Sequence, residues 1–436
     1  MSNRMMRPRK IQQLAAFVLS AALSSLGCGG SAADGMSPES PGTGDPSNPG
    51  TVGNPSNPPG PTDKVVVGYF AAWGVYARNY QVTDIPVDKL THINYAFANL
   101  SSDGECVLGD AYADTDKFYP GDTWDAGALR GSFHQLQVLK SKNPKLKTLI
   151  SVGGWTWSTN FSDIALTAAG RSKLAKSCVK FMKDYGFDGV DIDWEYPGGG
   201  GMAPGRPEDT SNFTALLAAL RTELDVAGRQ DGKSYLLSIA APAGPSNVSK
   251  LQLAQIHPLL DYINIMTYDF HGSWETTTNF NSPLYAATDD PSSDRSTLNT
   301  DAAVKSYLAG GLPSNKVVLG AAFYGHGWSG VGGQNKGLYQ AATGIPQGTW
   351  EAGTFDYHDL VANYIPTYTR SVHPQAKTPW LYSAQTGIMI SYDDPESLAL
   401  RGQYVNDNKL GGVMFWELSG DDAQHSLLTS LRSSLH

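Results

Sequence analysis

Asp188-Gly-Val-Asp191-Ile-Asp193-Trp-Glu195 alternates acidic and apolar residues near the middle of the chain. Because alternate residues of a strand point to the same side, the last three acids predict one acidic face and one apolar face. Three buried carboxylates in a row are costly unless they share protons or perform a task. The run therefore predicts a functional site at the end of a buried strand.

Two other interpretations of these acids remain open. An exposed strand also alternates charge, but it is expected at a sheet edge, whereas this run lies mid-chain and follows an apolar helical pattern through Gly186. A divalent metal would accept Asp-x-Asp oxygens as ligands, yet no second acidic or His cluster completes such a site. We expect no metal and no cofactor.

On both sides of this strand, short apolar runs alternate with helical patterns. Near-continuous apolar strands separated by helices are typical of a parallel sheet covered on both faces. The expected strands are Val65–Ala71, His92–Ala98, Thr148–Val152, Gly189–Trp194, Leu236–Ala240, Tyr262–Met266, Val317–Ala322 and Gly412–Trp416. The expected helices include Arg171–Tyr185, Asn212–Val226, Thr300–Ala309 and Pro395–Asn408. This α/β pattern favours a (β/α)8 TIM barrel, with a doubly wound sheet as the competing fold.

One connection is much longer than an ordinary barrel loop. It runs from Ala322 to Leu410, and only its last part has a helical pattern. A structureless loop of that length is improbable in a compact domain. We therefore expect residues 325–380 to form a small α+β insertion between strands seven and eight, as one wall of a cleft.

The first 27 residues have the pattern of an export signal. Basic residues precede an apolar stretch, Leu14–Leu26, that is too short for a spanning helix. Leu26-Gly-Cys28-Gly resembles a bacterial lipobox, although Ser25 stands where that motif usually has Leu. We expect residues 1–27 to be a lipoprotein signal peptide, with lipidation at Cys28. An ordinary signal peptide is the alternative.

Residues 28–63 are rich in Gly, Pro, Ser and Asn and predict an extended linker. It would join a membrane anchor to a barrel domain at residues 64–436, in a protein exported and lipid-anchored at the bacterial cell envelope. Of the 32 basic residues, four lie in the first 27 residues, which contain no acid, so 28 basic and 41 acidic side chains remain. That balance argues against nucleic acid or an anionic membrane surface as the partner. We expect a monomer.

The cysteines beyond Cys28 do not predict a metal site. Cys178 lies on the apolar stripe of a predicted helix and is expected to be a buried free thiol, with a disulfide to Cys106 as the alternative. The sequence contains no CxxC and no His pair at metal-ligand spacing, so zinc is not expected.

Five motifs, in chain order, resemble those of the family 18 glycoside hydrolases, the retaining chitinases. The acidic run matches the Asp-x-x-Asp-x-Asp-x-Glu signature, and the other four are Ser151-Val-Gly-Gly154, Met266-Thr-Tyr268-Asp269, Phe323-Tyr324-Gly325 and Gly412-Val-Met-Phe-Trp416-Glu417. The resemblance covers about Val65–His436 and extends to the subgroup with an α+β domain after strand seven. The chain departs from the family at His326, where an arginine is usual.

The resemblance implies hydrolysis of β-1,4-linked N-acetylglucosamine in chitin or chitooligosaccharides, with retained configuration. Glu195 would be the catalytic acid, and the substrate's own N-acetyl carbonyl would be the nucleophile. Asp193 would stabilise the acetamido group and share a proton with Asp191, while Tyr268 would donate to the acetamido carbonyl. Substrate-binding candidates are Asp269, Trp416, Tyr324, Met266, Tyr69, Phe97, Trp155 and Trp274. Ser151 is expected to be structural and to bond Asp191.

Three other functions remain open. An endo-β-N-acetylglucosaminidase acting on glycoprotein glycans shares the acidic run. A non-catalytic chitin-binding lectin typically lacks the acid, which this chain has as Glu195. A metal-dependent deacetylase needs a His-x-x-x-His pair, and no two of the nine histidines are four residues apart.

Overall fold

The computed structural model describes residues 64–436, so the predicted signal peptide, Cys28 and the linker lie outside the described residues. Eight parallel strands form a closed barrel, because the sheet order β1-β14-β8-β7-β6-β5-β4-β2 is completed by pairing of β1 with β2. The barrel strands are β1 (Val65–Ala71), β2 (His92–Leu100), β4 (Lys147–Gly153), β5 (Gly189–Asp193), β6 (Leu236–Ala241), β7 (Tyr262–Ile265), β8 (Val317–Ala322) and β14 (Gly412–Trp416). The TIM barrel is confirmed, and closure excludes the doubly wound sheet.

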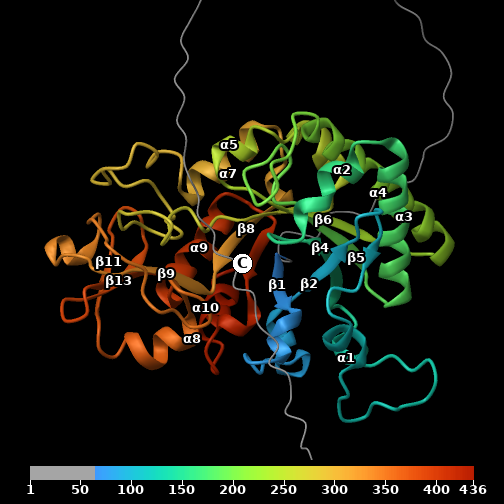
Figure 1. Ribbon diagram of the computed structural model, residues 1–436, viewed down its shortest axis with the longest axis horizontal. Helices are drawn as coiled ribbons and strands as arrows, with labels where there is room; N and C mark the ends of the chain where they lie inside the picture. The colour runs from blue at the N-terminus through green and yellow to red at the C-terminus, as the bar shows by residue number, and fades with distance from the viewer. Residues whose placement is uncertain (1–63) are drawn as a thin grey trace, which may run out of the picture. The chain divides into compact units, whose positions relative to one another are not determined.

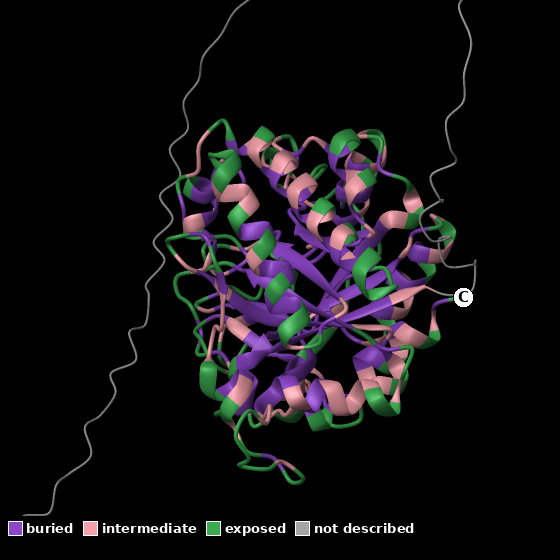
Figure 2. Cartoon of the chain, turned by 90° about the vertical axis from the view of Figure 1, so that its right-hand side faces the viewer, coloured by how far each residue is buried: buried purple, intermediate pink, exposed green. Residues whose placement is uncertain are grey.

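Helices surround these strands (Figure 1). They are α1 (Gly131–Lys142), α2 (Phe161–Ala165), α3 (Ala168–Asp184), α4 (Asp209–Asp231), α5 (Pro245–Val248), α6 (Leu253–Ile256), α7 (Thr300–Ala309), α9 (Pro395–Asp407) and α10 (Ser426–Ser433). A further short helix, α8 (Tyr357–Asp359), lies apart from them in the segment between β8 and β14. Figure 2 shows the strands buried in the interior, while the helices keep exposed outer faces. Each predicted strand and helix overlaps an observed one.

The apolar face of β5 packs outward against helices. Val190 and Ile192 are fully buried, and Trp194 stacks on Phe161 of α2 with ring centroids 5.2 Å apart. The same indole meets Phe213 of α4 edge-on at 5.5 Å. Removing an aromatic ring from such a core costs about 3–5 kcal/mol. Because this face is anchored among the helices, the acidic residues of β5 point into the barrel.

Between β8 and β14 the chain forms a second, antiparallel sheet of five strands, in the order β10-β9-β13-β12-β11. Figure 1 shows it in orange beside the barrel. Its strands are β9 (Tyr324–Trp328), β10 (Thr354–Asp356), β11 (Thr369–Val372), β12 (Pro379–Ser383) and β13 (Ile388–Ser391). The sheet extends beyond the predicted range 325–380, since the β12–β13 hairpin continues to Ser391. The predicted boundary was placed too early because the composition of the sequence changes near Trp380.

The two cysteines of the described residues are free thiols. Cys106, on β3 (Cys106–Val107), and Cys178, in α3, are both buried, as predicted for Cys178. The Cys106 N–H donates to Ser177 Oγ at 3.0 Å and holds β3 against α3. Within residues 64–436, no helix is both long and apolar enough to cross a membrane.

Candidate active site

Asp191 lies on the inward face of β5 and is fully buried. Its Oδ2 accepts hydrogen bonds from the hydroxyls of Tyr69 and Ser151, each at 2.8 Å, and its Oδ1 accepts one from Ser238 at 2.6 Å. The Asn264 amide lies 3.5 Å from Oδ1. Burial raises the pKa of Asp191, and the hydrogen bonds oppose that rise. The predicted contact with Ser151 is confirmed.

Strand register explains this network. Asp191 is the in-register partner of Ser151 on β4 and of Ser238 on β6, so the three side chains share one level of the barrel. A small hydroxyl side chain on each side leaves space for a carboxylate and supplies a donor to it.

Asp193 lies one level higher on the same face, but it lacks the hydrogen-bond donors that surround Asp191. Its side chain is buried, and Oδ1 has no hydrogen-bond partner among residues 64–436. Burial, followed by the charges of Glu195 and Asp191, raises the pKa of Asp193 well above its usual value. No hydrogen bond joins the Asp191 and Asp193 carboxyl groups of the described chain, so their shared proton stays a prediction.

Gly153 allows β4 to approach β5 at this level. Its φ is 110°, and a Cβ atom there would lie 2.3 Å from the backbone oxygen of Asp193. The adjacent Gly154 N–H donates to that same oxygen at 2.8 Å. Only glycine fits such a conformation and spacing without moving the strands. Both glycines of the Ser151-Val-Gly-Gly154 motif therefore have a structural role.

Glu195 lies two residues beyond β5, where the chain turns away from the barrel. Its N–H donates to Ser158 Oγ at 2.8 Å, and that hydroxyl donates to the Gly154 and Asp193 carbonyl oxygens. Burial in the site, with a further contribution from the charge of Asp269, raises the pKa of Glu195 to about 7. A carboxyl group with that pKa holds its proton near neutral pH, as a general acid must.

Tyr268 and Asp269 follow β7 at the same rim of the barrel. Tyr268 is 9% exposed, and burial followed by the charge of Asp269 raises its pKa well above the usual value, so the hydroxyl remains a donor. Asp269 has a left-handed backbone with a φ of 56°, and its N–H donates to Asn281 Oδ1 at 2.9 Å. The two side chains therefore reach the site from a tightly held turn.

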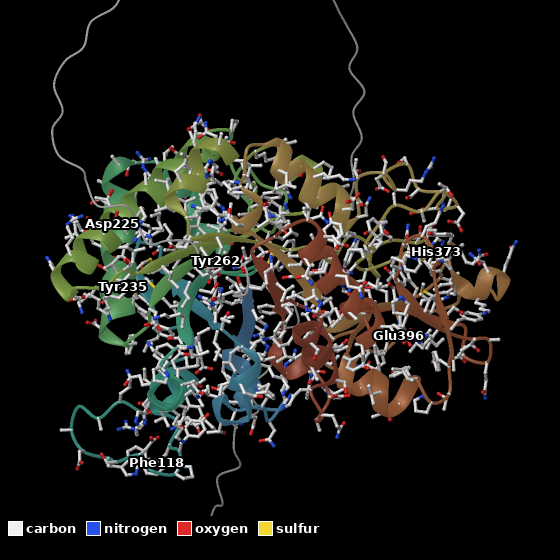
Figure 3. The ribbon with its side chains drawn as sticks, turned by 180° about the vertical axis from the view of Figure 1, so that it is seen from behind. Phe118, Asp225, Tyr235, Tyr262, His373 and Glu396 are labelled. Carbon is white, nitrogen blue, oxygen red and sulfur yellow. The ribbon has the colours of Figure 1, made fainter. Side chains whose placement is uncertain are left out.

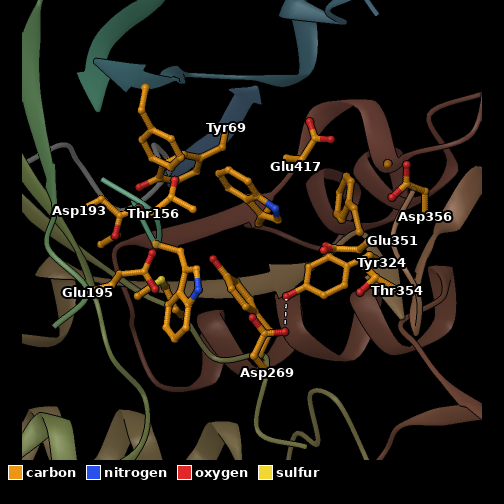
Figure 4. Close-up of a pocket in the computed structure, with 18 of the residues that line it drawn as sticks. Tyr69, Thr156, Asp193, Glu195, Asp269, Tyr324, Glu351, Thr354, Asp356 and Glu417 are labelled. Atoms are coloured by element: carbon orange, nitrogen blue, oxygen red, sulfur yellow. Dashed lines mark hydrogen bonds between the residues drawn. The ribbon is translucent and has the colours of Figure 1, made fainter. Parts of the chain in front are cut away.

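These residues lie in a cleft of about 570 Å³, lined by the barrel and by the second sheet. In Figure 4, Asp193 and Glu195 lie at one end and Glu351 and Asp356 at the other. The predicted residues that line it are Glu195, Asp193, Tyr268, Asp269, Trp416, Tyr324, Met266, Tyr69, Phe97 and Trp155. Asp191 is not among the lining residues, and it contacts the cleft through Tyr69.

Aromatic rings cover part of the cleft wall. Trp416 stacks on Phe97 with centroids 5.7 Å apart and planes 16° apart, and it lies 6.1 Å from Trp73. Trp155 is 40% exposed. Trp274 does not line the cleft in this structure; its half-exposed ring lies edge-on to His326, a cleft residue, at 5.0 Å. The structure thus brings all the predicted aromatic residues to the cleft except Trp274.

A charged group at the far end of the cleft was not predicted. Arg78, in the loop after β1, binds Asp356 of β10 at 2.9 Å and lies 3.5 Å from Glu417. Asp356 also accepts a hydrogen bond from the Trp350 indole at 2.7 Å. These residues lie in loops or in the second sheet, where no periodic pattern marks an inward side chain. Only Glu417, which directly follows Trp416 in the motif Gly412-Val-Met-Phe-Trp416-Glu417, had a signal in the sequence.

Nothing in residues 64–436 groups three or more His, Cys, Asp or Glu side chains in an arrangement that would hold a metal ion. The carboxyl groups of the cleft interact in pairs instead: the charge of Glu195 contributes to the raised pKa of Asp193, and Asp356 and Glu417 both contact Arg78. A pair of carboxyl groups with raised pKa is suited to proton transfer.

Two sequence relatives cover most of this chain. Chitinase A1 of Niallia circulans is 46% identical over 394 residues, which is 82% of this chain and 56% of the relative. Endochitinase 1 of Metarhizium robertsii is 44% identical over 358 residues, 81% of this chain and 80% of the relative. The chain thus spans little more than half the length of the first relative.

Solved structures agree with these relatives. Chitinase ChiA74 from Bacillus thuringiensis superimposes with a TM-score of 0.79 at 42% identity, over 84% of this chain and 69% of that one. A family 18 N-acetylglucosaminidase from Paenibacillus barengoltzii gives 0.72 at 35% identity, over 86% of this chain and 100% of that one. Residues 65–421 match Glycosyl hydrolases family 18. The chain is therefore a glycoside hydrolase and belongs to family 18.

Proposed function

We propose that this enzyme is a chitinase, which hydrolyses β-1,4-N-acetylglucosamine linkages in chitin and chitooligosaccharides with retention of configuration. The observation that carries the proposal is Glu195, a single acid in an aromatic-lined cleft whose pKa is raised to about 7. In the reaction, Glu195 protonates the glycosidic oxygen as the bond to the anomeric carbon breaks. Most of the relatives named above are chitinases.

The nucleophile in this proposal is the N-acetyl carbonyl oxygen of the substrate, which attacks the anomeric carbon to form an oxazolinium ion. The carboxyl groups in and beneath the cleft favour this route over a carboxylate nucleophile. Asp191 is buried and its two oxygens accept hydrogen bonds, and Asp269 is bonded to Tyr324. Burial, followed by the charges of Glu195 and Asp191, raises the pKa of Asp193, which favours the protonated form, a poor nucleophile.

Asp193 and Tyr268 are placed to hold the acetamido group. The buried Oδ1 of Asp193 has no partner among the described residues, and an acetamido N–H would supply one. The Tyr268 hydroxyl keeps its proton and can donate to the acetamido oxygen. Trp416, stacked on Phe97, offers an apolar floor to the sugar ring.

The test is Glu195→Gln, with Glu396→Gln on the surface helix α9 as a matched control. We expect the first variant to lose at least about 100-fold of its turnover of chitopentaose while binding remains measurable by calorimetry. The control should turn over as the unmodified enzyme does. Turnover unchanged in Glu195→Gln would defeat the proposal.

A product profile decides between a chitinase and its close alternatives. The Paenibacillus relative is named as an N-acetylglucosaminidase, so the second candidate function is the release of single N-acetylglucosamine units. Early products of chitopentaose, separated by length and observed by NMR, should be oligosaccharides in the β configuration. Monosaccharide alone would favour the second candidate, and release of glycans from a glycoprotein would favour an endo-β-N-acetylglucosaminidase.

We also propose that the enzyme is exported and anchored at the bacterial cell envelope by lipid on Cys28. The support is the sequence of residues 1–63, with its basic start, apolar stretch and linker composition. Growth with a labelled fatty acid should label the wild-type protein and not a Cys28→Ser variant. Wild-type protein without label would overturn the proposed anchor and leave the proposed activity untouched.

A further inference from the structure

His326 is a buried residue of the second sheet that lines the cleft. It lies on β9, pairs with Thr354 of β10 on one side and with Ser391 of β13 on the other, and is 6% exposed. The Trp274 ring lies edge-on to its imidazole at 5.0 Å. Strand pairing and ring packing together leave this side chain little freedom to rotate.

The imidazole of His326 holds one oxygen of Asp269. Nε2 lies 2.7 Å from Asp269 Oδ1, and the same oxygen accepts the Tyr324 hydroxyl at 2.6 Å (Figure 4 shows the Tyr324 bond). Because the carboxylate can only accept, Nε2 carries the hydrogen. Oδ2 of Asp269 accepts no hydrogen bond from residues 64–436, and the Asp269 side chain is 50% exposed.

Asp269 is thus fixed at two points from different parts of the chain. Asn281 binds its main-chain N–H at 2.9 Å, in the left-handed conformation with φ of 56°. Tyr324 and His326 bind its carboxylate from β9. Rotation of the carboxylate would break both bonds to Oδ1, so these bonds fix the position of Oδ2 in a residue that lines the cleft.

We propose that His326 is a positioning residue for substrate: its single Nε2 donor holds Asp269 Oδ1, so that Oδ2 accepts a sugar hydroxyl. The inference rests on the proposed function, because it assigns Asp269 to binding the sugar next to Glu195. An imidazole makes one bond and leaves Oδ2 free, whereas a guanidinium in the same place is able to engage both carboxylate oxygens.

A double-mutant cycle tests this role. His326→Ala should lower kcat/KM on chitopentaose about tenfold, since a charge-assisted hydrogen bond is lost. His326→Gln retains an N–H donor and should stay within about threefold of wild type. When Asp269 is already alanine, adding His326→Ala should change kcat/KM by less than about twofold, because the positioned group is gone.

His373→Gln is the matched control. His373 is also buried and binds a carboxylate, Asp289, through Nε2 at 3.0 Å, but it does not line the cleft. Figure 3 labels it on the side of the second sheet. Its substitution should leave kcat/KM unchanged. If His326→Ala does not fold, as judged by thermal unfolding, His326→Phe keeps the ring volume without a donor and should show the loss that the Gln variant avoids.

Three outcomes would overturn the inference. They are an unchanged kcat/KM in the folded His326→Ala or Phe variant, a loss in the Gln variant equal to that in Ala or Phe, and an undiminished loss in the Asp269→Ala background. Each of these can occur while Glu195→Gln is inactive, which would leave the proposed function standing. Full turnover by Glu195→Gln would instead defeat the proposed function itself.

Discussion

Asp191 and Asp193 point to the same side of β5 but have different surroundings. Asp191 lies in the lower level of the barrel interior, and Asp193 lies in the upper level. Asp191 accepts from three hydroxyls, whereas Asp193 has a buried oxygen with no partner among residues 64–436. A buried carboxyl group without partners costs free energy unless it stays protonated. Asp191 is satisfied without substrate, whereas Asp193 of the upper level, which also includes Glu195, is left for substrate to complete.

Among the changes that separate the two levels, Asp193→Asn in the upper level should cause the largest loss of activity. The amide is neutral, as the protonated carboxyl is, so folding should not suffer. It cannot become the anion that stabilises a positive intermediate, so kcat should fall at least about 100-fold. Steady-state kinetics on chitopentaose and thermal unfolding of the same samples measure both quantities. A kcat near that of wild type, or a large drop in unfolding temperature, would contradict the contrast between the two levels.

Raising the pH should remove activity by titrating Glu195 in the upper level. Glu195, whose pKa burial raises to about 7, must be protonated to act, so kcat/KM should fall as pH rises through that value. Between about pH 7 and pH 9 the protonated fraction falls about 50-fold. Circular dichroism over the same range checks that the protein remains folded. Activity that stays constant up to pH 9 would exclude Glu195 as the acid that limits the reaction.

The barrel was predicted correctly because its strands and helices have local periodic patterns in the sequence. The alternation at β5 and the motif order placed Asp193, Glu195 and Tyr268 in one cleft, because parallel strands of a barrel end at the same rim. Helix ends were less well predicted: α3 begins at Ala168, where the Thr167 hydroxyl accepts from the Gly170 N–H, three residues before the expected start.

The rest of the cleft could not be predicted because loops and the second sheet build it. Arg78 and Asp356 meet across 278 residues of chain, and no local pattern records such a contact. Trp274 follows the motif Met266-Thr-Tyr268-Asp269, where a site residue is expected, but the turn after Asp269 places its ring against His326 instead of in the cleft. Sequence patterns thus predict the site residues at the ends of the barrel strands better than those contributed by loops and the second sheet.

Asp191→Ala should affect the lower level, with a smaller loss of activity and a larger loss of stability. Tyr69, Ser151 and Ser238 would each lose a buried hydrogen-bond acceptor, which should lower the free energy of unfolding by about 3 kcal/mol. We expect kcat to fall about tenfold, through Asp193, whose pKa depends on the Asp191 charge. Urea unfolding measures the stability, and a variant as stable as wild type would contradict the assigned role of the network.

Removal of divalent cations should leave the activity unchanged, because neither Asp191 nor Asp193 is free to bind a metal ion. A calcium or magnesium ion bound by Asp191 and Asp193 would need free lone pairs directed at one point. Both Asp191 oxygens already accept hydrogen bonds from hydroxyls, and burial raises the pKa of Asp193, which favours a protonated carboxyl group over a metal ligand. Activity should therefore be unchanged by EDTA. A loss that Ca²⁺ or Zn²⁺ restores would mean that the hydroxyls around Asp191 reorient and that the lower level takes part in the chemistry directly.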